Sequence, residues 1–239
     1  MDEAGLFVIE GEKFIEEIAA GWEKVSVICS ESYVKSKPGA AGRHAAVLVV
    51  KDSLFGRISE TKNPQGVMAV CRKKCFDPDA VFGRAGALLI YAEEINDPGN
   101  LGTIIRTAHA CGACGVFTSD NSADAYNPKV LRASAGSFFH IPVFERQSLN
   151  SFAEKCAAKK IKITAADTGG RESPYEIDFT KNTAIMIGNE ARGLSREAVC
   201  TADHLVRIPM PGGAESLNAS VACAVLLYEA TRQRLAAAK

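Results

Sequence analysis

The sequence predicts an α/β protein, in which a small α/β domain precedes, along the chain, a large domain built on an open parallel sheet. Short apolar runs of strand length alternate with segments of helical spacing along the 239 residues, as in sheets whose parallel strands are joined by helices. The alternation breaks at Arg72–Asp79, where a basic triplet precedes Asp-Pro. Since such a break is typical of an interdomain connection, we expect one domain over residues 1–75 and another over residues 76–239.

The smaller domain is expected to alternate strands and helices in the βαβ manner. Its four strands are short runs rich in aliphatic residues, found at Leu6–Ile9, Val25–Cys29, Ala46–Val50 and Val67–Cys71. Helical features occur in Lys13–Ala20 and again in Ser53–Ser59. The polar residues 30–44 separate the second strand from the third.

The larger domain continues the alternation through six predicted strands. These apolar runs occupy Gly86–Tyr91, Gly115–Thr118, Ile141–Phe144, Ile161–Ala166, Ala184–Ile187 and His204–Ile208. After the turn at Asn96–Gly99, helical segments are expected at Asn100–Cys111, Pro128–Ser134, Ser148–Lys159 and in the apolar stretch that ends near Tyr228. Since strands and helices alternate, pattern alone predicts a doubly wound parallel sheet.

The last third of the chain, from Asn182 to Tyr228, indicates a ligand site. Two short buried strands, Ala184–Ile187 and His204–Ile208, run directly into loops of Gly, Asn, Glu and Ser. Loops at the carboxyl ends of parallel strands are where open α/β sheets bind ligands. Neither loop has the glycine spacing of a dinucleotide site or of a phosphate loop, so the ligand belongs to a less common class.

Composition is that of an ordinary globular protein. Lys and Arg together number 28, Asp and Glu also number 28, and 47% of the residues are hydrophobic. Any affinity for nucleic acid must therefore come from local patches of positive charge. No run approaches the roughly 20 apolar residues of a membrane helix, and the acidic N-terminus lacks the basic start of a signal peptide. We therefore expect a cytoplasmic protein without a membrane segment.

The eight cysteines are expected to be reduced thiols that serve as small apolar packing residues. A split zinc site could be imagined from Cys71 with Cys75 and Cys111 with Cys114. The second pair, however, lies at the end of a predicted helix, among glycines. We therefore expect no metal site.

Three motifs resemble the signature motifs of the SpoU/TrmH branch of the SPOUT superfamily, which are RNA ribose 2′-O-methyltransferases. The first is Asn100-Leu101-Gly102, followed by Arg106 six residues after the Asn. The second is I-G-N-E-A-R-G-L-S, which begins at Ile187, and the third is R-I-P-M-P-G-G-A-E-S-L-N-A-S, which begins at Arg207. All three occur in the family's order.

The resemblance implies several features that the residue pattern does not. It implies a C-terminal trefoil knot, in which the chain after Ile208 threads through a preceding loop; no periodicity argument would predict a knot. It implies S-adenosyl-L-methionine as the methyl donor, RNA as the substrate, with rRNA favoured over tRNA, and a homodimer with each active site at the interface. A ribosomal-protein-like RNA-binding domain often precedes the methyltransferase, and Glu10 and Asn63–Gly66 resemble positions of that domain.

A ribose hydroxyl is a poor nucleophile, so methyl transfer requires its orientation and the removal of its proton or the stabilisation of its charge. The resemblance implies that Arg106 activates the hydroxyl. Because Arg is effectively always protonated, we favour stabilisation of the developing alkoxide over a role as base. Asn100 is expected to orient Arg106 or the ribose, and it could also cap a helix.

The remaining predicted site residues come from the second and third motifs. Glu190 can accept hydrogen bonds from loop backbone or pair with an Arg, and it could instead only shape its loop. Ser216, Asn218 and Ser220 are expected to open the last helix as capping residues, and the family implies that the first two line the active site. Donor contacts, mainly through main-chain groups, are expected at Gly188, Gly193, Ile208, Met210 and Leu217.

Two other functions were compatible with parts of the sequence. A non-catalytic RNA-binding or ribosome-assembly protein could have the same fold, but the intact site residues favour the enzyme. A nucleotide-binding α/β protein unrelated to RNA is disfavoured because glycine-rich phosphate loops are absent. Glu215 is a departure from the family pattern, in which many members have an uncharged residue before the Ser at position 216.

Overall fold

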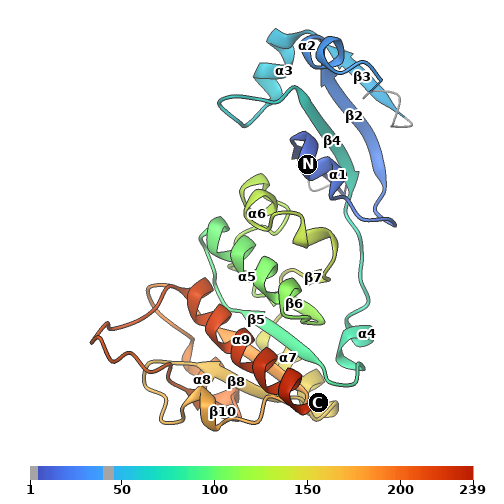
Figure 1. Ribbon diagram of the computed structural model, residues 1–239. Coiled ribbons are helices and arrows are strands. Elements are labelled where there is room, and N and C mark those ends of the chain that lie inside the picture. The colour runs from blue at the N-terminus through green and yellow to red at the C-terminus, as the bar shows by residue number, and fades with distance from the viewer. Residues whose placement is uncertain (1–4, 40–45, 239) are drawn as a thin grey trace. The chain divides into compact units, whose positions relative to one another are not determined.

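The computed structural model describes residues 5–39 and 46–238, which form α/β structure throughout (Figure 1). The chain divides into two compact units, Met1–Cys75 and Phe76–Lys239. Residues 40–44 of the expected polar segment and the acidic residues 1–4 lie outside the described residues.

The first unit contains a four-stranded mixed sheet in the order β1-β4-β2-β3. Its elements are β1 (Leu6–Glu10), α1 (Glu12–Glu16), β2 (Lys24–Ser30), α2 (Glu31–Ser36), β3 (Val47–Val50), α3 (Asp52–Ile58) and β4 (Val67–Arg72). Only β2 and β3 pair in parallel, whereas β1 and β2 run antiparallel to β4. The βαβ prediction is therefore correct only for β2, α2 and β3. It fails for the other pairs, since apolar periodicity does not encode strand direction.

Helix α2 lies within the segment that was predicted only as polar. The Ser30 hydroxyl accepts a hydrogen bond from the Tyr33 amide at 3.2 Å, which caps the helix. Tyr33 is its one buried residue, so the helix lacks the apolar repeat by which sequence analysis recognises helices. Helix α1 ends at Glu16 rather than at Ala20.

The second unit contains a six-stranded sheet in the order β10-β8-β9-β5-β6-β7, and every neighbouring pair is parallel. The strands are β5 (Leu88–Ala92), β6 (Gly115–Thr118), β7 (Val143–Phe144), β8 (Lys162–Ala166), β9 (Thr183–Ile187) and β10 (His204–Val206). This confirms the predicted parallel sheet. Strand β7 begins later than expected and follows Pro142, which has no N–H to donate.

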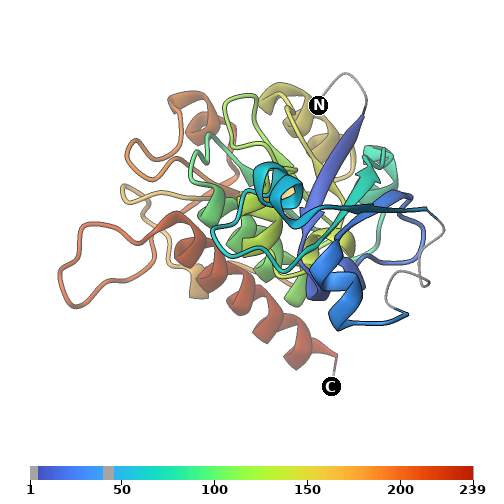
Figure 2. The ribbon, with the colours of Figure 1, turned by 90° about the horizontal axis from the view of Figure 1, so that it is seen from above.

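Helices cover both faces of this sheet, as the doubly wound prediction requires. They are α4 (Pro78–Phe82), α5 (Pro98–Ala110), α6 (Pro128–Ala133), α7 (Leu149–Ala158), α8 (Arg196–Thr201) and α9 (Ala219–Ala237), with short 3₁₀ turns η3 (Ser137–Phe139) and η4 (Pro174–Glu176). Helix α9 lies alongside α5 (Figures 1 and 2). Side chains of α4, α7 and α8 form the core with Leu89, Tyr91 and Phe117 of the sheet.

Buried thiols contribute to the packing of both units. Cys71 and Cys156 are fully buried, and all eight cysteines are free. Burial raises the pKa of Cys71 to about 11 and the pKa of Cys156 to about 12, so both thiols are protonated near neutral pH. Within the described residues, no group of three or more His, Cys, Asp or Glu side chains could hold a metal ion.

The loop after β8 packs directly against β10. Gly170 lies so close to this strand that a Cβ there would be 2.7 Å from the Leu205 carbonyl oxygen. Glu172 pairs with Val206 in an isolated parallel bridge, and its carbonyl accepts from the Arg207 amide at 2.9 Å. The threading of the chain after Ile208 through a preceding loop stays a prediction.

Gly102, in the first motif, allows α5 and α6 to pack closely. A Cβ at this position would lie 2.5 Å from the Ala133 Cβ and 2.6 Å from the Val130 carbonyl oxygen. The Cβ would also lie 3.0 Å from the Ser134 amide nitrogen, and the Val130 and Ser134 atoms belong to the backbone of α6 and its C-cap, which cannot rotate away as a flexible side chain could. The glycine is therefore required by helix packing.

We predict that Gly102→Ala lowers the free energy of unfolding by about 1–3 kcal/mol, the usual cost of overpacking, despite the better helix propensity of Ala. The measurement is equilibrium unfolding in urea. Gly56→Ala in α3 is the matched control, because a Cβ there meets no atom within 4 Å and should stabilise that helix. Equal stabilisation by both substitutions would disprove the packing role of Gly102.

Candidate active site

A cavity of about 250 Å³ opens at the carboxyl ends of β8, β9 and β10. The last residues of these three strands, Ala166, Ile187 and Val206, line it together with the loops that follow. This is the edge of the sheet at which the sequence predicted a ligand site. The residues predicted to contact the donor all line the cavity, and they are Gly188, Gly193, Ile208, Met210 and Leu217.

The loop after β9 closes upon itself beside the cavity. The Asn189 amide donates to the Gly193 carbonyl at 3.0 Å, and the Gly193 amide donates to the Asn189 carbonyl at 2.8 Å. A Cβ at Gly188 would lie 2.3 Å from backbone atoms of Gly193 and Leu194, and Gly193 itself has a φ of +69°. Gly188 is therefore required by the close approach of the loop's own backbone, and its expected contact with the donor stays a prediction.

The side-chain amide of Asn100 joins all three motif segments. Its Nδ2 donates to Glu190 Oε1 at 2.7 Å. Its Oδ1 accepts from Asn218 Nδ2 at 2.9 Å and from Ser220 Oγ at 3.3 Å. These four residues, which we call the polar junction, come from α5, the loop after β9 and the start of α9. Glu190 also lines the cavity, so the junction lies beside it.

Three of the predicted helix caps, Asn100, Ser216 and Ser220, have different roles in the structure. Ser220 is the second residue of α9, and its hydroxyl donates to Asn218 Oδ1 at 2.7 Å. Asp97 caps α5, and its Oδ1 accepts from the Asn100 amide at 2.8 Å, so Asn100 lies in the first turn and is not the cap. Asn218 caps α9 as predicted, accepting from the amides of Ser220 and Val221. Ser216 lies outside this helix, in the exposed loop before it, and lines the cavity.

Arg106 lies on α5, two turns after Asn100, and its side chain is exposed. It forms no hydrogen bond or ion pair with any residue that the structure describes, and it is not among the residues that line the cavity. Among the described contacts, Asn100 therefore does not orient Arg106, and its expected role towards the ribose stays a prediction. The side chain of Asn100 orients Glu190 and Asn218 instead, and Glu190 accepts from an amide rather than from an Arg.

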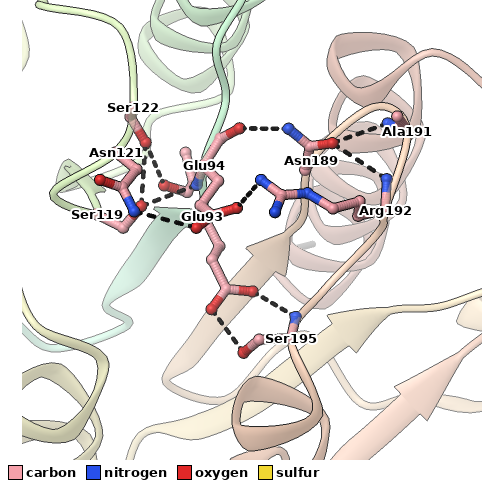
Figure 3. Close-up of polar contacts among 10 residues, drawn as sticks. Glu93, Glu94, Ser119, Asn121, Ser122, Asn189, Ala191, Arg192 and Ser195 are labelled. Carbon is pink, nitrogen blue, oxygen red and sulfur yellow. Dashed lines mark hydrogen bonds and ion pairs between the residues drawn. The ribbon is translucent and has the colours of Figure 1, made fainter.

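Sequence analysis missed a second set of contacts, which Figure 3 shows between the end of β5 and the loop after β9. Glu93 is buried and accepts from the Ser195 amide at 2.7 Å and from the Ser195 hydroxyl at 2.8 Å. The Glu94 carbonyl accepts from Asn189 Nδ2 at 2.8 Å, and its carboxylate pairs with Arg192. The sequence feature that could have indicated these contacts is the pair Glu93 and Glu94, which directly follows the apolar strand Leu88–Ala92.

No helix within residues 5–39 and 46–238 is long and apolar enough to cross a membrane.

Comparisons with known proteins identify the family of this chain. The family model described as SpoU rRNA Methylase family matches residues 87–228, and a model described as MRM3-like substrate binding domain matches residues 2–69. The 23S rRNA (guanosine(2553)-2′-O)-methyltransferase RlmP of Bacillus subtilis is 36% identical over 228 residues, covering 93% of this chain and 87% of the relative. The 23S rRNA (uridine(2479)-2′-O)-methyltransferase of Streptomyces viridochromogenes is 35% identical over 198 residues, covering 81% of this chain and 69% of the relative.

Solved structures with similar folds include two with bound donor. The SpoU methyltransferase AviRb from Streptomyces viridochromogenes in complex with the cofactor AdoMet has a TM-score of 0.86 at 30% identity, and the match covers 98% of this chain and 93% of that chain. The AdoMet-bound rRNA methyltransferase from Sinorhizobium meliloti has a TM-score of 0.84 at 31% identity, and the match covers 97% of this chain and 88% of that chain. The family model and these relatives show that the chain belongs to the SpoU rRNA methylase family.

Proposed function

We propose that this protein methylates a ribose 2′-hydroxyl of ribosomal RNA, with the donor held in the cavity at the ends of β8, β9 and β10 and the RNA approaching from the side of Arg106. As a member of its family, it is an S-adenosyl-L-methionine-dependent RNA 2′-O-ribose methyltransferase. The observation that carries the proposed arrangement is the polar junction, in which Asn100 holds Glu190 and Asn218 beside the cavity.

The residues around the cavity fit the chemistry of the donor. Ile187, Ile208 and Leu217 offer apolar surface for an adenine ring, and backbone groups of the glycine-rich loop lie beside them. Asp167 and Glu190 bring carboxylates, which suit a ligand that carries positive charge on sulfur and on its amino group. When bound, S-adenosyl-L-methionine supplies an electrophilic methyl group activated by the neighbouring sulfonium.

The residues of this chain would act on the acceptor as follows. Arg106 is exposed and has no partner among the described residues, so its five N–H donors are available to a phosphate or a ribose oxygen. We assign it the stabilisation of the charge that develops on the 2′-oxygen. The polar junction would fix Glu190 and Asn218 near the reacting ribose, and Ser216 would contact it from the exposed loop.

The substrate assignment to rRNA rather than tRNA follows the relatives, because the two described above are named for 23S rRNA. We assign residues 1–75 to recognition of that RNA, since a substrate-binding domain model matches residues 2–69. We also propose that the protein acts in the cytoplasm, which is compatible with a ribosomal RNA substrate.

We further propose a homodimer through the second unit. Three apolar side chains on α9 are exposed at a spacing of seven residues: Val221 at 47%, Tyr228 at 61% and Leu235 at 65%. This spacing places them along one stripe of the helix, which is suited to a partner surface. The stripe begins at the first turn of α9, next to the polar junction.

Arg106→Ala should lower the single-turnover rate of RNA methylation by more than ~10²–10³-fold, because it removes a donor that stabilises charge in the transition state. Donor affinity, measured by calorimetry, should stay nearly unchanged, and Arg106→Lys should not restore the rate because Lys lacks the planar fork. Arg84→Ala is the matched control, since Arg84 is also exposed and precedes β5 at the opposite edge of the sheet. A near-normal rate for Arg106→Ala would remove this residue from the mechanism.

Light scattering should show a dimer at tens of micromolar. Tyr228→Arg places a charge in the apolar stripe and should shift the equilibrium towards monomer. Leu54→Arg, at an exposed apolar position of the first unit, should leave the dimer intact. A monomeric wild-type protein would contradict the proposed assembly.

Removal of residues 1–75 should leave donor affinity intact and weaken methylation of rRNA, because the second unit has its own sheet and core. Calorimetry with the donor and methylation assays on rRNA fragments separate the two effects. If the shortened protein methylated RNA as well as the full chain, the first unit would not be the recognition module.

A further inference from the structure

One wall of the cavity is a single exposed loop. Six consecutive residues, from Gly188 to Gly193, line the cavity, and Glu190, Ala191, Arg192 and Gly193 are all exposed. Within the loop, Asn189 Oδ1 accepts from the amides of Ala191 at 2.9 Å and Arg192 at 3.1 Å. These local hydrogen bonds shape the tip of the loop, but they do not fix its position relative to the sheet.

Two adjacent residues at the end of β5 connect this loop to the sheet (Figure 3). Glu93 binds Ser195 where the loop enters α8. Glu94 binds the tip, because its carbonyl accepts from Asn189 Nδ2 and its carboxylate pairs with Arg192. Ser119 fixes Glu94 from the other side, accepting from the Glu94 amide at 2.8 Å.

Glu94 occupies a backbone conformation that its residue type rarely adopts. Its φ is +51°, in the left-handed region favoured by Gly and Asn. The strain is local, and a glycine at this position would relieve it. The carboxylate nevertheless lies in a network, with 29% of the side chain exposed, and also accepts from Asn121 Nδ2 at 3.2 Å. The Arg192 side chain, by contrast, is 71% exposed, and its ion pair is with the Glu94 carboxylate.

We infer that Glu94 is a positioning residue for the methyl donor, because its carboxylate holds Arg192 and thereby keeps the loop 188–193 in the shape that forms the cavity wall. The inference rests on the proposed donor cavity. Glu94 itself does not line that cavity and is not a catalytic residue. Its backbone contact with Asn189 would persist in any substitution, so the inference concerns the carboxylate alone.

Glu94→Gly removes the carboxylate and relieves the left-handed strain at the same time. We expect the dissociation constant of S-adenosyl-L-methionine to rise about two- to fivefold, the range for loss of a partly exposed ion pair. The unfolding midpoint should stay the same or rise, and the rate at saturating donor should be unchanged. A purely structural residue would instead lower stability and leave donor affinity unaltered.

Lys160→Gly is the matched control. Lys160 is exposed, has a φ of +55° and precedes β8, at the edge of the sheet opposite the cavity. The same relief of strain should therefore leave donor affinity unchanged. A rise in the dissociation constant equal to that of Glu94→Gly would overturn the inference.

A double-mutant cycle tests whether Glu94 acts through Arg192. Arg192→Ala should weaken donor binding, and adding Glu94→Gly to it should produce no further loss. Independent, multiplicative effects would contradict the proposed route. High salt should also reduce the difference between wild type and Glu94→Gly, because it screens an exposed ion pair.

Hydrogen exchange on the protein without donor provides a readout that does not depend on the donor assignment. The amides of Ala191, Arg192 and Gly193 should exchange faster in Glu94→Gly than in wild type, and those of β9 should not. Unchanged exchange in the loop would overturn the inference. A wild-type protein that failed to bind S-adenosyl-L-methionine would instead refute the proposed function, so the two failures are distinguishable.

Discussion

The arrangement of the site depends on one side chain, the amide of Asn100. Its N–H donates to Glu190 and its oxygen accepts from Asn218 and Ser220, so one residue joins segments that are 90 and 118 positions away in the chain. The planar side-chain amide of Asn can donate from its nitrogen and accept at its oxygen at the same time. The loops that line the cavity and the helix that carries Arg106 are therefore held in one arrangement by a side chain that touches all three motifs.

Much of the second unit could be predicted because its signals are local. Strands β5 and β9 are buried along their whole length, which gives the unbroken apolar runs typical of parallel sheets. Asn218 is a helix cap that the residue type alone suggested. The five residues predicted to contact the donor lie in the loops after β9 and β10, so the topology of a parallel sheet places them at one edge.

The contacts between segments could not be predicted in the same way. Nothing in the order of residues relates Glu94 to Arg192 or Asn100 to Glu190, because the members of these pairs are 98 and 90 positions apart in the chain. The capping role suggested for Asn100 was wrong because Asp97, three residues earlier, is the cap. In the first unit, apolar spacing located the strands but not their direction, so the antiparallel pairing of β1 and β2 with β4 was unforeseen.

In the proposed function, the cavity and the residues beside it serve the methylation of one ribose in ribosomal RNA. The most direct test is a complete map of 2′-O-methylated nucleotides in rRNA and tRNA from a strain that lacks the protein, compared with the same strain after the gene is restored. We predict that one rRNA ribose loses its methyl group in the deletion and regains it on restoration. An unchanged map, or a loss confined to tRNA, would contradict this account.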